Sequence, residues 1–374
     1  MNQKVTLIIP TKNRPALLAR LLSYYLKVKA DFSIFIGDSS DSEFSEQVSQ
    51  VISKFKNCLD IKHIYYPSSM GGTRAVVNML PLVETPYSIF TGDDDFLILD
   101  RVKEGVHFLD CHPDYSLVGG AVGTIPIEFV NDNIFHPKSL QFFNYRSIEN
   151  DSPSQRLIDF FSHPGSINNT FDLRRTEEMK NIFSKTIELG LDSDLCATQL
   201  SETGIGGASI ILGKGKKLSG LYLVMLTHER RIGSACRMVT FDAMSHENWP
   251  KHLNSVINLW ASYLHQKENL DSLTAERIAQ IAFMINLGPR VLNHYNEIIR
   301  QDSSIAKIIS IKQTSFVEKI FERLPKLPGI MEEFFRRNYG FTLKTDVCLK
   351  NILELRAKRD QNILDICDEI TASH

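Results

Sequence analysis

The stretch VTLIIPTKNR, residues 5–14, sets the pattern for the first quarter of this 374-residue chain. Its first five side chains are β-branched or large and apolar, which favours a strand, and Pro10 ends the run. Apolar side chains then recur at helical spacing over residues 14–28. A strand that leads within a few residues into an amphipathic helix predicts the first part of a βαβ unit.

The same alternation continues to about residue 100. Further strands are expected at residues 31–36, 61–66 and 87–90, with helices at residues 44–55 and 73–83 between them. Strands that alternate with helices of about 10 to 15 residues predict a mostly parallel sheet, and in such sheets ligands bind at the carboxyl ends of the strands. We therefore expect one binding edge formed by the residues that follow the strands, namely 11–14, 38–40, 67–74 and 93–95.

The middle of the chain has a weaker pattern. Short strands and loops are expected between residues 117 and 168, and helices at residues 174–189 and 193–201. Two apolar runs, 207–212 and 218–226, flank the turn-like sequence GKGKK. This arrangement predicts a β-hairpin.

Beyond residue 245 the pattern changes to long amphipathic helical stretches. We therefore divide the chain into an α/β domain over residues 1–244 and a helical domain over residues 245–374. Residues 316–337 combine apolar and basic side chains, which fits either a helix pair on a core or contact with an anionic membrane surface. Nothing in the sequence specifies an oligomeric state.

Composition excludes several classes of protein. The chain is 43% hydrophobic and 23% charged, which excludes collagen-like and disordered chains, and its formal net charge of −2 makes nucleic acid an unexpected partner. The six cysteines form no CxxC pair and no zinc-type spacing, so we expect reduced thiols. Neither a signal peptide nor a membrane-spanning run of about 20 apolar residues is visible, so the expected location is the cytoplasm, including the inner face of its membrane.

Three consecutive aspartates, Asp93, Asp94 and Asp95, follow the strand expected at residues 87–90. Burying several carboxylates without a cation is costly, because like charges drive protonation. A hard divalent cation removes that cost, and Mn²⁺ or Mg²⁺ suits a site of carboxylates and phosphate oxygens. The alternative is a solvated acidic turn or a helix cap.

Four motifs resemble inverting glycosyltransferase family 2, in the same order and at similar spacing. They are VTLIIPTKNR at residues 5–14, IGDSS at 36–40, GGTRAVVN at 71–78 and FTGDDDFL at 90–97. The resemblance implies a GT-A fold, which is a Rossmann-like α/β domain with a mostly parallel central sheet and flanking helices, here followed by the helical C-terminal domain. It also implies a nucleotide-sugar donor as the first ligand.

By this resemblance, the residues that bind the donor nucleotide are Pro10, Thr11, Arg14, Asp38, Ser39, Arg74, Asp93 and Asp94. Asp38 corresponds to the aspartate that contacts the base or ribose, and Arg74 lies near the base or phosphate. The family's glycine and arginine signature at residues 71–78 follows the third expected strand. A sugar nucleotidyltransferase, the nearest rival enzyme, would carry its glycine loop after the first strand.

The resemblance also implies a metal site held by Asp95 and Asp93, with Asp94 as a substitute, because the family's commonest form has an aspartate where Gly92 stands. His228 is the expected third ligand, since GT-A enzymes often bring a late histidine to the metal. A structural histidine is the alternative.

GLDSDL, residues 190–195, resembles the family's Glu-Asp-x-Asp-Leu segment, although Leu191 replaces the usual acidic residue. The resemblance makes Asp192 the general base that takes the proton of the acceptor hydroxyl. The alternative is that Asp192 or Ser193 only caps the helix that follows.

Basic residues late in the α/β domain have two interpretations. Lys214, Lys216, Lys217, Arg230 and Arg231 would either neutralise the leaving diphosphate or lie in a solvated loop.

The expected function is therefore metal-dependent transfer of a hexosyl or related group from a nucleotide diphosphate sugar to a saccharide or lipid-linked saccharide, with inversion. By the same resemblance, the expected setting is assembly of bacterial surface polysaccharide. The rivals are a sugar-1-phosphate nucleotidyltransferase and a non-catalytic protein that binds a nucleotide or sugar.

Overall fold

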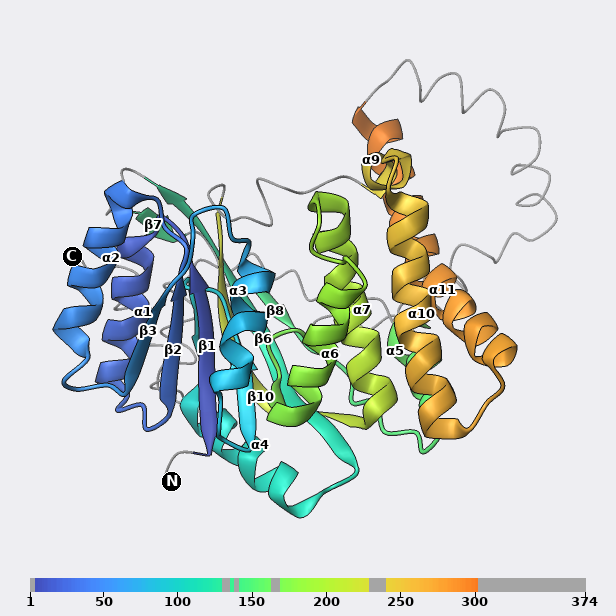
Figure 1. Ribbon diagram of the computed structural model, residues 1–374, viewed down its shortest axis with the longest axis horizontal. Coiled ribbons are helices and arrows are strands. Elements are labelled where there is room, and N and C mark those ends of the chain that lie inside the picture. The colour runs from blue at the N-terminus through green and yellow to red at the C-terminus, as the bar shows by residue number, and fades with distance from the viewer. Residues whose placement is uncertain (1–3, 130–134, 138–140, 163–168, 229–239, 302–374) are drawn as a thin grey trace, which may run out of the picture.

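The computed structural model describes residues 4–129, 135–137, 141–162, 169–228 and 240–301. These residues form a ten-stranded sheet with helices on both faces (Figure 1). Its main path has the order β3-β2-β1-β4-β9-β6-β10-β5, and β7 and β8 pair with β6.

The N-terminal half of the sheet is parallel, as the alternation predicts. Its strands are β1 (Val5–Thr11), β2 (Ser33–Asp38), β3 (Ile61–Tyr65) and β4 (Tyr87–Phe90). The connecting helices are α1 (Pro15–Lys27), α2 (Ser42–Phe55) and α3 (Gly72–Met79), and the short 3-10 turn Leu80–Leu82 follows α3. The order of these four strands puts the ends of β1, β2 and β4 next to one another.

The other half of the sheet is mixed. It contains β5 (Asp95–Leu97), β6 (Tyr115–Phe129), β7 (Phe135–Pro137), β8 (Gln141–Phe143), β9 (Leu173–Arg175) and β10 (Lys214–Thr227). β9 is antiparallel to β4 and β6, whereas β10 is parallel to β6 and antiparallel to β5. The pairing of β10 with β5 aligns Met225 with Asp95 and so brings the end of β10 to the three aspartates.

β6 is longer than the short strands expected after residue 117. Gly119 and Gly120 in its middle resemble turn residues in the sequence, yet both lie within the strand. A Cβ atom at Gly119 would lie 1.9 Å from a carboxylate oxygen of Asp172, so this glycine makes room for a neighbouring side chain.

The predicted hairpin at residues 207–226 is wrong. Residues 195–212 form the helix α7 (Leu195–Leu212), and the second apolar run belongs to β10. Between residues 200 and 211 only Glu202 is exposed. A helix that is buried all round shows no apolar stripe, so its sequence resembles a buried strand.

The remaining helices are α4 (Leu99–Cys111), α5 (Pro153–Ser162), α6 (Thr176–Glu188), α9 (Thr240–Ser245), α10 (Trp249–Glu268) and α11 (Ser272–Gln301). One apolar core lies under α1, α2 and α4, and a second includes side chains of α5, α6, α7, α10 and α11. In Figure 1 α10 and α11 lie beyond α7, away from α1 and α2.

The helical character predicted after residue 245 is confirmed for α10 and α11. α10 packs closely on α7, where the indole N–H of Trp260 donates to the carbonyl of Gly204 at 2.9 Å. The domain boundary at residue 245 stays a prediction, and the apolar and basic stretch at residues 316–337 lies outside the described residues. Among the described helices, none has the length and apolar character needed to cross a membrane.

Candidate active site

The residues that follow β1, β2 and β4 meet at one edge of the sheet. The Ser39 amide donates to the Thr11 carbonyl at 3.0 Å, and the Thr11 hydroxyl donates to Oδ2 of Asp93 at 2.7 Å. Pro10 is aligned with Gly37 in the sheet and lies against the start of α3, where a Cβ at Gly72 would be 3.8 Å from the proline ring. The grouping expected from strand order is therefore present in the structure.

The three aspartates are buried. Asp93 and Asp94 lie in the turn between β4 and β5, Asp95 begins β5, and each residue is at most 2% exposed. The alternative of a solvated acidic turn is therefore wrong. The cap of the next helix, α4, is Ile98, so none of the three aspartates caps it.

A guanidinium and an imidazole face these carboxylates. Nη1 of Arg14 lies 3.0 Å from Oδ1 of Asp93 and 3.7 Å from Oδ2 of Asp94. His228 directly follows β10, and its Nε2 lies 2.8 Å from Oδ2 of Asp94. Asp93 thus has a cationic partner in Arg14, and Asp94 contacts both Arg14 and His228.

Burial governs the protonation of this group. Burial raises the pKa of Asp93, although the Arg14 guanidinium and the Thr11 hydroxyl act in the other direction. Burial alone would lower the pKa of Arg14, but the carboxylates of Asp93, Asp94 and Asp95 raise it overall. Burial thus disfavours the ionised form of Asp93, and further positive charge at this site would favour that form.

Close packing explains why a glycine stands at residue 92, where the family's commonest form has an aspartate. A Cβ atom at this position would lie 2.6 Å from Oδ1 of Asp94 and 3.0 Å from Oδ2 of Asp95. Its amide also lies 3.3 Å from the same oxygen of Asp95 and donates to it. The turn therefore has no room for a side chain at residue 92 while both carboxylates keep these positions.

Asp38 at the end of β2 is held by a partner that the sequence did not suggest. Its Oδ1 accepts the Ser40 amide at 2.9 Å, and its Oδ2 lies 3.3 Å from Nε2 of His63 on β3. Burial would raise the pKa of Asp38, but the hydrogen bonds from His63 and Ser40 lower it overall. His63 was missed because only the β2–β3 pairing brings it to this edge.

Asp192 is joined to the first turn of α3 by Arg74. Oδ2 of Asp192 accepts from Nε of Arg74 at 2.7 Å. The Asp192 side chain is 7% exposed and that of Arg74 is 52% exposed. The carboxylate is thus nearly buried behind a guanidinium that solvent and ligands can reach.

The interpretation of Asp192 or Ser193 as the helix cap is wrong. The N-cap of α7 is Asp194, whose side chain accepts from the Ala197 amide at 2.8 Å. The Ser193 hydroxyl instead donates to the Gly190 carbonyl. Capping therefore does not account for Asp192.

Asp194 should contribute to stability in a pH-dependent way. Burial would raise its pKa, but hydrogen bonds from Ala197, His252 and Asn248 lower it to about 2. We expect Asp194→Ala to lower the free energy of unfolding at pH 7 by about 0.5–2 kcal/mol, the usual effect of losing a cap.

Because the folded pKa lies below the ordinary value of 3.8, the contribution is present above about pH 4 and lost as pH falls towards 2. Urea unfolding at pH 7 and at several lower pH values measures both effects, with Ser193→Ala as the neighbouring control. A difference between wild type and Asp194→Ala that grows with acidification would contradict the assignment.

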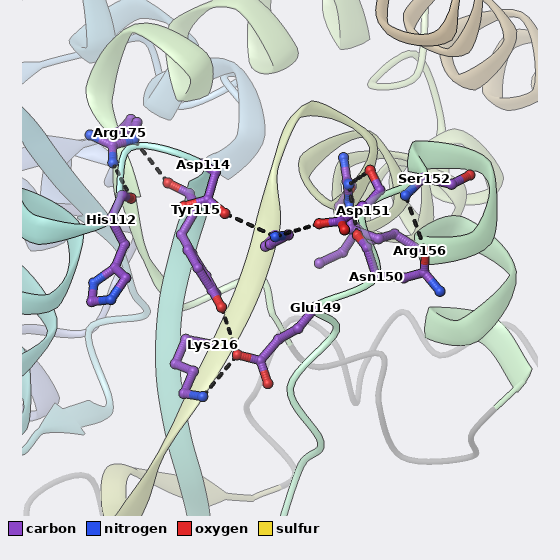
Figure 2. A network of polar contacts seen from close by, with 12 residues as sticks. His112, Asp114, Tyr115, Glu149, Asn150, Asp151, Ser152, Arg156, Arg175 and Lys216 are labelled. Atoms are coloured by element: carbon purple, nitrogen blue, oxygen red, sulfur yellow. Dashed lines mark hydrogen bonds and ion pairs between the residues drawn. The ribbon is translucent and has the colours of Figure 1, made fainter.

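The lysines of the misassigned turn lie in β10 and are already paired. Lys214 contacts Asp114 and Asp151. Lys216 contacts Glu149, which also accepts from Tyr115 (Figure 2). Lys217 pairs with Asp172. These ion pairs do not support a role for the three lysines in neutralising the diphosphate. Arg230 and Arg231 lie outside the described residues.

A further group of ligating side chains lies outside this edge. Asp194, Cys196 and His246 bring one ligand atom each to within 4.8 Å of one another. The spacing of residues in the sequence does not reveal this group, because His246 comes about 50 residues after Asp194 and Cys196.

Comparison with known proteins supports a relationship over the N-terminal part. Residues 6–170 match the model of Glycosyl transferase family 2. Over 113 residues the chain is 26% identical to the Poly(ribitol-phosphate) beta-N-acetylglucosaminyltransferase TarS of Staphylococcus aureus, a match that covers 29% of this chain and 19% of TarS. The aligned region thus spans about a fifth of that relative's length.

Comparison with solved structures also supports the fold, through the likeness to TarS 1-349. The crystal structure of S. aureus TarS 1-349 in complex with UDP-GlcNAc has a TM-score of 0.50 at 15% identity and covers 80% of this chain and 81% of that one. The mannosyltransferase PcManGT from Pyrobaculum calidifontis, in complex with GDP-Man and Mn²⁺, has a TM-score of 0.44 at 13% identity over 87% and 88%. Residues 6–170 of this chain thus match Glycosyl transferase family 2, and the fold described above is similar to that of TarS 1-349.

Proposed function

We propose that the chain transfers a sugar from a nucleotide diphosphate sugar to an acceptor hydroxyl, with inversion at the anomeric carbon. The observation that carries the proposal is the buried turn Asp93–Asp95 at the carboxyl edge of a parallel sheet, inside the segment that matches the family. The likeness to TarS supports a setting in bacterial surface polysaccharide and an acceptor that is a polymer or a lipid-linked saccharide.

The proposed donor site extends along the ends of β1, β2 and β4. Asp38, Thr11 and Ser39 would contact the nucleoside, since they lie buried where parallel sheets bind nucleotides. Arg14 and Arg74 would face the phosphates. Arg74 is the more exposed of the two, and its Nη groups would contact a phosphate while Nε keeps its hydrogen bond to Asp192.

The ligand types at this edge are those that a divalent metal takes, although the ligand atoms of the described residues Asp93, Asp95 and His228 do not all lie within 4.8 Å of one another. Asp93, Asp95 and His228 are the residues proposed to hold it, with Asp94 between them, and carboxylate oxygens with one imidazole suit Mn²⁺ as well as Mg²⁺. When bound, such an ion would supply positive charge to the leaving diphosphate. Arg14 remains beside Asp93 and would add a second, fixed positive charge at the same place.

Asp192 is the proposed general base. Its carboxylate is nearly buried and is oriented by the hydrogen bond from Arg74, as a base that must point in one direction requires. It would take the proton of the acceptor hydroxyl as the oxygen attacks the anomeric carbon. The bond from that carbon to the diphosphate breaks on the opposite face.

Titration of the purified protein with UDP, GDP, CDP and dTDP by calorimetry, with and without Mn²⁺, tests the proposal. We expect one nucleotide to bind in a metal-dependent manner, because the diphosphate and the aspartates need a cation between them. Asp95→Asn should weaken that binding at least tenfold, or about 1.4 kcal/mol. The matched control is Asp100→Asn, which changes an exposed aspartate in the first turn of α4. Absence of binding by all four nucleotides under every metal condition would overturn the donor assignment.

A further inference from the structure

Asp194, Cys196 and His246 form a compact group away from the triple aspartate, which we call the α7 cluster. Asp194 caps α7 and Cys196 lies in its first turn, whereas His246 lies between α9 and α10. One ligand atom from each lies within 4.8 Å of the others. The cluster therefore joins two segments that are distant in the sequence.

Hydrogen bonds around the α7 cluster fix its members. Oδ2 of Asp194 is 3.1 Å from Nδ2 of Asn248 and 2.9 Å from Nε2 of His252. The Asn248 amide donates to Nδ1 of His246 at 3.3 Å, so one residue orients two members of the cluster. Cys196 is fully buried, with its Sγ 3.8 Å from the carbonyl of Ala243.

The types of metal ligand distinguish the α7 cluster from the aspartate turn. Thiolate, imidazole and carboxylate together favour Zn²⁺, whereas Mg²⁺ and Mn²⁺ prefer oxygen ligands. Ligating carboxylates in zinc sites are themselves held by hydrogen bonds, which is the position that His252 and Asn248 take here. Three protein ligands leave the fourth tetrahedral position for water.

We propose that the α7 cluster is a Zn²⁺ site, with Asp194, Cys196 and His246 as ligands and His252 and Asn248 as outer partners. A zinc ion there would tie the start of α7 to the segment between α9 and α10. Asp194 lies two residues after Asp192, so the ion would also hold the loop that carries the proposed base. The site itself does not depend on the sugar-transfer proposal.

Metal binding to the full chain tests this site directly. After treatment with a chelator, the protein is titrated with Co²⁺ and then Zn²⁺. We expect one equivalent of Co²⁺ per chain to produce the near-ultraviolet band of a thiolate ligand, and Zn²⁺ to abolish this band by displacing the Co²⁺. Cys196→Ser should abolish the band and weaken Zn²⁺ binding more than about 100-fold, beyond the 10- to 100-fold typical of outer-partner changes.

Two further variants keep the result interpretable. Cys111→Ser removes an exposed thiol and should leave the band unchanged, and Asp95→Asn should do the same. If Cys196→Ser does not fold, His246→Asn gives the same test from the partly exposed side, and Zn²⁺ should raise the melting temperature of wild type but not of this variant. A band that persists in Cys196→Ser, or Zn²⁺ affinity unchanged in folded His246→Asn, would overturn the proposal.

Discussion

Asp192→Asn is expected to lower the turnover number for sugar transfer by about 100- to 10,000-fold, the usual contribution of general base catalysis. The amide keeps the size of the carboxylate and accepts the hydrogen bond from Arg74, but it cannot take a proton at neutral pH. Donor affinity should change little, because the proposed base acts on the acceptor. Turnover assays together with nucleotide calorimetry measure the two quantities separately.

Ser193→Ala is the matched control, since Ser193 is exposed and adjacent but donates only to the Gly190 carbonyl. We expect its turnover to stay within about twofold of wild type. Turnover retained in Asp192→Asn would contradict the assignment of the base. Nucleotide binding lost together with turnover would instead give Asp192 the role of positioning Arg74.

Arg14→Met is expected to lower the free energy of unfolding at pH 7 by about 3–5 kcal/mol, the usual effect of removing one partner of a buried ion pair. Methionine replaces much of the aliphatic stem, so the loss is mainly that of the guanidinium that faces Asp93 and Asp94. Urea unfolding without divalent metal measures the effect. Adding Mn²⁺ should recover part of it if the metal occupies the proposed site, because bound ligand stabilises the folded state.

The loss of stability in Arg14→Met should depend on pH. The pKa of Asp93 is raised by burial even with Arg14 present, and loss of the guanidinium should raise it further. A carboxyl group with a raised folded pKa favours folding below its unfolded pKa and loses that contribution as pH rises through the folded value. The deficit of Arg14→Met should therefore be smallest near pH 4 and grow towards neutrality.

Lys12→Met removes a positive charge from the same loop, where Lys12 contacts the Ser68 carbonyl rather than the aspartates. We expect a change of no more than about 0.5 kcal/mol, as for most surface substitutions. The double variant Arg14→Met, Asp93→Asn should recover stability relative to Arg14→Met alone. Equal losses for Lys12→Met and Arg14→Met would rule out a specific role for the buried pair.

Local sequence patterns were sufficient for the parallel half of the fold. β1 to β4 are short apolar runs followed by clear amphipathic helices, so both periodicities are visible. The meeting of Thr11, Ser39 and Asp93 followed from strand order alone. The first part of α7 was also predicted as a helix, but residues 207–211 are buried and begin with a glycine, so this part lacks the periodicity that identifies a helix.

Local sequence patterns could not predict the contacts between distant segments. The partners of Asp38 and Asp192 are His63 and Arg74, and no spacing rule links either pair. The residue type also did not distinguish Asp192 from Asp194, although only Asp194 has the backbone geometry of a cap. His228 was named from the resemblance, and its contact with Asp94 depends on the pairing of β10 with β5.

The packing of α10 on α7 provides an intrinsic spectroscopic reporter. The chain has two tryptophans, Trp249 and Trp260, and both lie in α10. The indole of Trp260 is fully buried, and a Cβ atom at Gly207 of α7 would lie 2.5 Å from it. Tryptophan emission therefore follows the packing of α10 on α7 and α11, where both indoles also contact Phe283, whereas far-ultraviolet circular dichroism follows every helix and strand. Coincident melting curves from the two signals would mean that the helical region and the sheet unfold as one cooperative unit, and an earlier fluorescence transition would identify an autonomous helical domain.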